Sequence, residues 1–81
     1  MEKRLSIISI IVEKPEAVER VNALLHANRS FIIGRMGIPC RERNCSIISV
    51  VLDAPMDATS ALSGKLGMVD GVTAKTLTAK G

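Results

Sequence analysis

The stretch SIISIIVEKP at residues 6–15 recurs forty positions later as SIISVVLDAP at residues 46–55. Five of the ten positions are identical, and three more exchange one aliphatic residue for another. Each copy is an apolar run of the kind found in strands and ends at a proline. A segment with helical periodicity and a second apolar run follow each copy. We therefore interpret the chain as two βαβ halves that follow one pattern.

The apolar periodicity predicts the bounds of the elements. In the first half we expect a strand at residues 5–13, a helix from Pro15 to about Asn28 and a strand at residues 31–38. Pro15 suits the first turn of a helix, because its ring fixes φ near the helical value. In the second half we expect a strand at residues 45–53, a helix from Pro55 or Asp57 to Leu66 with Gly67 as its stop, and a strand at residues 72–78. The residues expected to face inward are Val18, Val21, Leu24 and Leu25 in the first helix, and Ala58, Ala61, Leu62 and Leu66 in the second.

This β-α-β-β-α-β order predicts an α+β, ferredoxin-like fold for residues 1–81 as a single domain. The expected architecture is a four-stranded antiparallel sheet with two helices on one face, and with the first and third strands in the middle. Alternation places one set of aliphatic side chains under the helices: Ile8, Ile10, Val12, Ile48, Val50 and Leu52.

The opposite sheet face is also apolar, which is unusual for an antiparallel sheet that faces water. We expect it to carry Leu5, Ile7, Ile11, Ile47 and Val51, interrupted by Ser9 and Ser49, with Phe31, Ile33 and Leu77 on the flanking strands and Arg35 and Lys75 at the margin. A contiguous apolar patch of this kind usually marks an interface. We therefore predict self-association through this face, with a two-fold dimer as the minimal unit. The alternative is that loops or the C-terminal tail cover it.

Composition excludes several classes of protein. The 81 residues allow one domain, and 47% hydrophobic residues exclude a disordered chain. No apolar run approaches the roughly 20 residues of a membrane-spanning helix. A single aromatic residue and scattered basic residues, with a net charge of +3, argue against direct nucleic-acid binding. Two cysteines without a secretion signal favour a cytoplasmic protein.

Two sets of side chains could take part in redox chemistry, metal binding or anion binding. Cys40 and Cys45 flank an expected hairpin and could form a disulfide, a redox sensor or half of a metal site shared between subunits. We favour ordinary strand-end cysteines and a solvated His26, and expect no metal or cofactor. Arg41 and Arg43 form a basic hairpin tip that could meet an anion or an acidic partner, or could simply be solvated.

The segment SGKLG at residues 63–67 is not a phosphate loop, because Thr59 and Leu66 occupy positions that need glycine and serine or threonine. Gly64 within a helix costs about 1 kcal/mol relative to alanine. Either a neighbouring chain or ligand approaches it closely, or the helix end frays there. No catalytic triad or convergent carboxylate pair can be assembled, so we expect no enzymatic activity.

Several segments together resemble the iron-only hydrogenase system regulators, short bacterial proteins with an ACT-like, ferredoxin-type fold. They are the strands at residues 5–12 and 46–52, RMGIPCRERN at residues 35–44, and ALSGKLG at residues 61–67 with Gly71, Val72 and Lys75. The resemblance implies a cytoplasmic protein of anaerobic bacteria that is associated with hydrogenase maturation. It also implies a distant likeness to the ligand-binding half of nickel-responsive regulators, which assembles as a tetramer. ACT domains commonly hold amino acids near the first strand-to-helix turn.

The leading hypothesis is a non-enzymatic, homodimeric or homotetrameric regulatory domain that binds a small ligand at subunit boundaries. Candidate ligand-binding residues are Glu13, Lys14, Pro15, Asp53, Gly64, Lys65 and Gly67. The chain has no DNA-reading element, so a transcriptional effect would act through a partner. The alternatives are an adaptor that binds a hydrogenase-related protein through Arg41 and Arg43, and a redox or metal module that uses Cys40 and Cys45.

Overall fold

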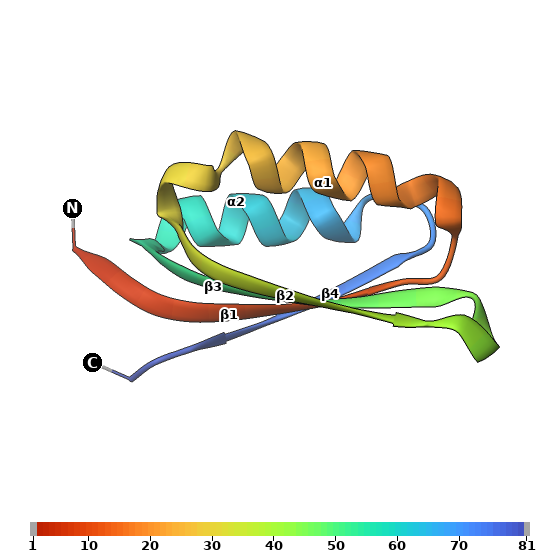
Figure 1. The fold of residues 1–81 in the computed structure, drawn as a ribbon. Coiled ribbons are helices and arrows are strands. Elements are labelled where there is room, and N and C mark those ends of the chain that lie inside the picture. The colour runs from red at the N-terminus through yellow and green to blue at the C-terminus, as the bar shows by residue number, and fades with distance from the viewer. Residues whose placement is uncertain (1, 81) are drawn as a thin grey trace.

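The repeated stretches form the two central strands of one sheet (Figure 1). The computed structural model describes residues 2–80, in which β1 spans Lys3–Val12 and β3 spans Cys45–Pro55. These strands pair antiparallel, with Ile8 opposite Val50. β2 (Ile32–Cys40) lies beside β3 and β4 (Val72–Thr78) lies beside β1, in the order β2-β3-β1-β4. The α+β, ferredoxin-like prediction is confirmed.

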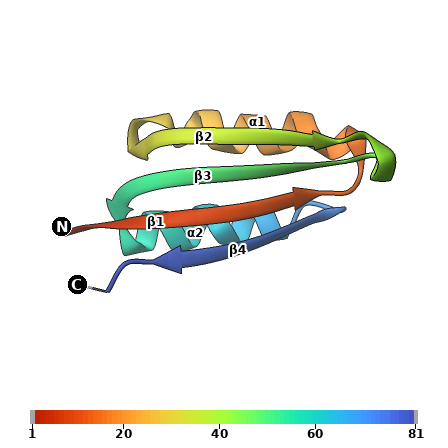
Figure 2. The ribbon, with the colours of Figure 1, turned by 60° about the horizontal axis from the view of Figure 1, so that its bottom comes forward.

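Both helices lie on the same face of the sheet (Figure 1). α1 (Val18–Ala27) lies behind β2 and β3, and α2 (Met56–Gly67) lies behind β1 and β4 (Figure 2). Short 3-10 turns precede α1 and flank β2: η1 (Pro15–Ala17), η2 (Arg29–Phe31) and η3 (Arg41–Arg43). Pro15 occupies the first position of η1, as the sequence predicts. No helix among residues 2–80 is long and apolar enough to cross a membrane.

The core lies between the helices and one face of the sheet. The six strand residues expected under the helices are at most 5% exposed, which confirms the predicted alternation. The helices add the buried residues Val21, Leu24, Leu25, Leu62 and Leu66. The hydrophobic core is therefore built of aliphatic side chains, and the buried polar residues are Ser6 and Thr59.

The inward face of α2 is partly different from the prediction. Ala61 is exposed, and Thr59 is buried instead. The Thr59 hydroxyl is buried without a hydrogen-bond partner among the described residues. Gly67 is the last helical residue rather than a left-handed stop after the helix. The second helix is thus rotated about its axis relative to the expectation.

β2 is the strand whose faces the sequence predicts wrongly. It begins at Ile32, so Phe31 lies in η2 and not in the sheet. The register with β3 shifts between Ile32 and Gly34, which is a β-bulge. Because one extra residue reverses the alternation, Arg35 lies opposite Val50 on the helix-covered face rather than at the margin of the open face.

Candidate functional site

The face of the sheet away from the helices carries two aliphatic rows, and we call it the open face. One row runs across β2, β3 and β1 through Ile38, Ile47 and Ile11. The other runs across β3, β1 and β4 through Val51, Ile7 and Leu77. Ser9 and Ser49 form a paired polar band between the rows. Lys75 lies beside Ser9 at the β4 edge, as predicted.

The large hydrophobic side chains on the open face are unusually exposed to solvent. Leu5 is 53% exposed and Ile11 is 42% exposed. In Figure 1 no segment of residues 2–80 crosses beneath the sheet. After β4, the backbone N–H of Ala79 donates to the Leu5 carbonyl at 2.9 Å, so the chain continues beside β1 rather than across the face. The alternative, that loops or the C-terminal tail cover this face, therefore does not hold for the described residues.

Two residues of the open face were missed by sequence reasoning. Met36 and Ile38 are 61% and 52% exposed, opposite Ser49 and Ile47. They extend the apolar surface onto the edge strand. A glycine within a strand, such as Gly34, indicates a β-bulge. It does not show which neighbouring residue is inserted, and so it does not show which side chains face the open side. Ile33, a predicted interface residue, lies at the bulge itself and is exposed.

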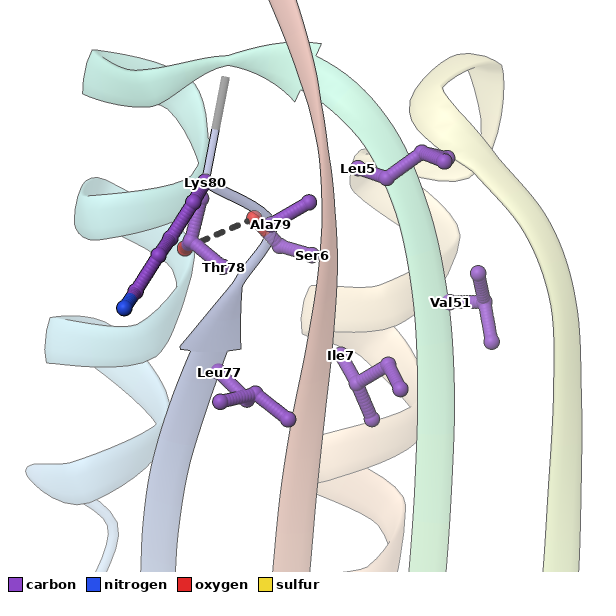
Figure 3. A pocket seen from close by; sticks show the side chains of 8 residues that line it. All are labelled: Leu5, Ser6, Ile7, Val51, Leu77, Thr78, Ala79 and Lys80. Atoms are coloured by element: carbon purple, nitrogen blue, oxygen red, sulfur yellow. Dashed lines mark hydrogen bonds between the residues drawn. The ribbon is translucent and has the colours of Figure 1, made fainter.

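One end of the open face is hollowed (Figure 3). The hollow has a volume of about 440 Å³ and is bounded by Leu5, Ile7, Val51 and Leu77, with the segment 78–80 at its rim. The hydroxyls of Ser6 and Thr78 hydrogen-bond to each other at 3.0 Å, so they are satisfied within the chain. The lining is therefore almost wholly apolar and suits an apolar group.

The predicted ligand-binding residues do not converge on one site. Glu13, Lys14 and Pro15 are exposed at the end of β1, beside the turn at residues 70–71. Asp53 lies opposite Leu5, near the other end of the same strand. Lys65 lines a separate hollow between the helices, and Gly64 and Gly67 are exposed. The two turns that the repeat relates therefore lie at opposite ends of the sheet.

The turn after β1 is held against the turn before β4. The Glu13 N–H donates to the Gly71 carbonyl at 2.7 Å, and Lys14 forms an ion pair with Asp70. Hydrogen bonding and charge raise the pKa of Lys14 and lower the pKa of Asp70. The pair therefore stabilises the fold at intermediate pH. That stability is lost as pH falls through the lowered pKa of Asp70 or rises through the raised pKa of Lys14. Both groups are solvent-exposed, so salt screens the effect.

Gly71 is the glycine that this turn requires. Its φ is +83°, and a Cβ there would lie 2.6 Å from the Lys14 Cγ. We expect Gly71→Ala to destabilise the fold by about 1–2 kcal/mol, the usual cost of a left-handed non-glycine residue. Urea denaturation measures this cost.

Gly64→Ala is the matched control, because a Cβ on Gly64 meets nothing within 4 Å in its own chain. This substitution should stabilise an isolated chain by about 0.5–1 kcal/mol. Destabilisation by Gly64→Ala would show that another molecule packs against that position. Equal effects of the two substitutions would contradict the assigned role of Gly71.

The two cysteines lie opposite each other at the end of the β2–β3 hairpin. Both are free thiols and half-buried. Burial and the neighbouring Cys40 raise the pKa of the Cys45 thiol, so it is a weak nucleophile at neutral pH. The residues from Glu2 to Lys80 contain no cluster of three metal-ligating side chains, and His26 is exposed on α1. The geometry does not support an activated thiol.

The hairpin that joins β2 and β3 extends beyond the helices (Figure 1). Its turn is η3 followed by Asn44, whose φ of 54° reverses the chain. Arg41 and Arg43 are both exposed there. This arrangement leaves two guanidinium groups accessible to a partner.

The chain is similar to proteins of known sequence and structure. Residues 4–76 match the TM1266-like family model, described as "Iron-only hydrogenase system regulator, putative". Protein TM1266 from Thermotoga maritima is 45% identical, with a TM-score of 0.94 over 98% of this chain and 100% of that one. No curated protein matches.

More distant structures share the fold alone. The C-terminal domain of the MgtC protein from Mycobacterium tuberculosis is 17% identical, with a TM-score of 0.71 over 95% of this chain and 88% of that one. A formyltetrahydrofolate deformylase from Pseudomonas putida is 15% identical, with a TM-score of 0.66 over 94% of this chain and 29% of that one.

Proposed function

This chain belongs to the TM1266-like family of iron-only hydrogenase system regulators, and from that premise we propose a non-enzymatic regulatory domain that self-associates through the open face. The observation that carries the proposal is the pair of aliphatic rows left uncovered on the sheet. An antiparallel sheet that faces water normally carries polar residues there. A second copy would bury these rows against their own equivalents.

The dimensions of the open face are compatible with a dimer. Strands lie about 4.8 Å apart and rise about 3.3 Å per residue, so this four-stranded sheet presents roughly 500 Å² per copy. Two copies bury roughly 1,000 Å² in total, the lower limit for a specific interface. Aliphatic residues dominate this area, which favours association over hydration.

A second copy on the open face would also close the hollow beside Leu5, Ile7 and Leu77. A cavity of about 440 Å³ is within the range of small-molecule sites. We therefore place the regulatory ligand at this subunit boundary. The earlier candidates Glu13–Pro15 and the segment 64–67 lie elsewhere on the surface, and Asp53 lies opposite Leu5 but does not line this hollow.

Thermal-shift screening against amino acids, metal ions and nucleotides, in reducing and anaerobic buffer, tests the regulatory function. A ligand at 100 times its Kd should stabilise the fold by about 2.7 kcal/mol. Leu77→Gln, at the rim of the hollow, should remove the shift, whereas Thr76→Gln on the other face of β4 should keep it. An absence of any shift across the screen would count against a ligand sensor.

A second candidate function rests on the projecting hairpin. An adaptor role would use Arg41 and Arg43 to bind an acidic surface of a hydrogenase-related protein. We expect the double substitution Arg41→Glu and Arg43→Glu to abolish co-purification of such a partner, because each change reverses one charge. Arg4→Glu, at the far end of the molecule, is the control. Co-purification that survives the double substitution would exclude this role for the hairpin.

A further inference from the structure

The positive charge of the chain is concentrated in the half of the molecule that includes the β2 edge of the sheet. Residues 20–52 contain five arginines and one glutamate, whereas the rest of the chain has six basic and seven acidic residues. This segment therefore carries a net charge of +4, against −1 for the rest of the chain. It comprises most of α1 together with β2 and β3, which lie on the same side of the sheet (Figure 2). Two of these arginines, Arg29 and Arg35, line one hollow, whereas Arg20 lines a hollow between the helices and Arg41 and Arg43 lie in the hairpin turn.

A hollow of about 380 Å³ lies on this edge, between α1 and β2. Leu25, which is buried, and Ile32, which is half-buried, are its apolar residues. The remaining lining residues are Asn22, His26, Arg29 and Arg35. Arg35 reaches this side only because the bulge after Ile32 reverses the alternation of β2. Bulges commonly re-aim side chains in this way next to functional sites.

Hydrogen bonds within the chain hold both guanidinium groups in place. Arg35 donates to the Asn22 side-chain oxygen at 2.9 Å, and Arg29 donates to the His26 carbonyl at 3.0 Å. A guanidinium has five N–H donors, so most donors of both groups remain available. Neither arginine forms an ion pair within residues 2–80, where the Lys14–Asp70 pair stands alone.

The C-terminal end of α1 would ordinarily repel an anion, because its free carbonyls carry partial negative charge. Here three of those carbonyls, of Leu24, Leu25 and His26, accept hydrogen bonds. The Asn28 side-chain amide donates to the Leu24 carbonyl at 2.9 Å, and Arg29 covers the carbonyl of His26. The two guanidinium groups bring full positive charges to the hollow, which oppose the partial negative charge of this helix end.

We propose that this hollow binds a small molecule through a phosphate or pyrophosphate group. Two arginines supply two positive charges, which a phosphate monoester with about −1.5 to −2 charge matches and a carboxylate only half matches. A guanidinium group also fits phosphate oxygens bidentately. The hollow is large enough for part of an organic phosphate. It lies on the helix side of the sheet, so the proposal holds whether or not copies associate through the open face.

Titration of the full chain with inorganic pyrophosphate, at constant ionic strength and followed by amide NMR shifts, tests the site. Shifts should centre on residues 22–35. Arg35→Gln and Arg29→Gln should each weaken binding at least tenfold. Asn22→Ala keeps the charge but frees Arg35, and should weaken binding severalfold. Arg20→Gln removes one charge from α1, the helix that carries Asn22, at a position outside the hollow. This substitution should change binding less than twofold.

Three outcomes would overturn the proposal. Equal weakening by Arg20→Gln and Arg35→Gln would show a diffuse charge effect. Acetate that binds as tightly as pyrophosphate would exclude phosphate selectivity. A single-stranded oligonucleotide that outcompetes pyrophosphate, and whose affinity depends on Arg41 as strongly as on Arg35, would assign the edge to an extended polyanion. An organic phosphate such as ADP that binds tighter than pyrophosphate, with the same dependence on Arg35, would support the site as proposed.

Discussion

Ile11→Glu should raise the dissociation constant of the dimer at least a thousandfold. Ile11 lies between Ile47 and Thr73 in an aliphatic row of the open face. In a two-fold dimer the substitution introduces one unpaired carboxylate from each copy into an interface that excludes water, and burying an unpaired charge is costly. Sedimentation velocity at micromolar concentration measures the loss. Because Ile11 is 42% exposed in the single chain, the fold should persist, which circular dichroism can verify.

Ala23→Glu is the control for this experiment. Ala23 is exposed on α1, on the opposite side of the molecule from the open face. The substitution Ala23→Glu adds the same charge as Ile11→Glu but outside the open face, so the sedimentation of this variant should match that of the unmodified chain. If Ile11→Glu also sediments like the unmodified chain, the open face is not the interface.

Ile10→Ala should destabilise the fold by about 2–5 kcal/mol, the usual cost of truncating a fully buried isoleucine. Ile10 is completely buried between Ile48 and Ala74 on the two neighbouring strands. A domain of this size has a small core, so this loss is a large share of its stability. Urea denaturation at fixed protein concentration measures it, because association through the open face also contributes to stability.

Ser9→Ala tests the same strand on its other face. Ser9 precedes Ile10, points to the open face and lies outside the core. Its truncation should change stability by less than about 0.5 kcal/mol, as surface substitutions usually do. A cost for Ser9→Ala equal to that of Ile10→Ala would show that the two faces of β1 are assigned wrongly.

The central strands were predictable because period-two alternation in β1 and β3 is uninterrupted. Ile8, Ile10 and Val12 face the helices, and Ile7 and Ile11 face away, as the pattern indicates. The faces of the flanking strand β2 were not predictable, because its bulge inserts one residue whose position no local sequence pattern indicates. That single residue moved Arg35 to the helix side and left Met36 and Ile38 on the open face.

Contacts between segments distant in the sequence determine which other side chains meet on the surface. These contacts could not be predicted from the sequence either. The Lys14–Asp70 pair joins residues 56 positions apart, and the bond from Arg35 to Asn22 depends on how α1 lies over β2. In α2, Thr59 is buried and Ala61, which was expected to face inward, is exposed, because packing and not apolar periodicity alone sets the rotation of a short helix about its axis. The phosphate-binding hollow proposed above was therefore visible only in the fold.

Sedimentation equilibrium of the unmodified chain tests the central claim most directly. The aliphatic rows of the open face are exposed to solvent in a single copy and should drive association. The measured molecular mass of the protein at 10–50 micromolar should therefore be at least twice 8.7 kDa. A mass of 8.7 kDa across that range would contradict the account, because the open face would then remain exposed to solvent.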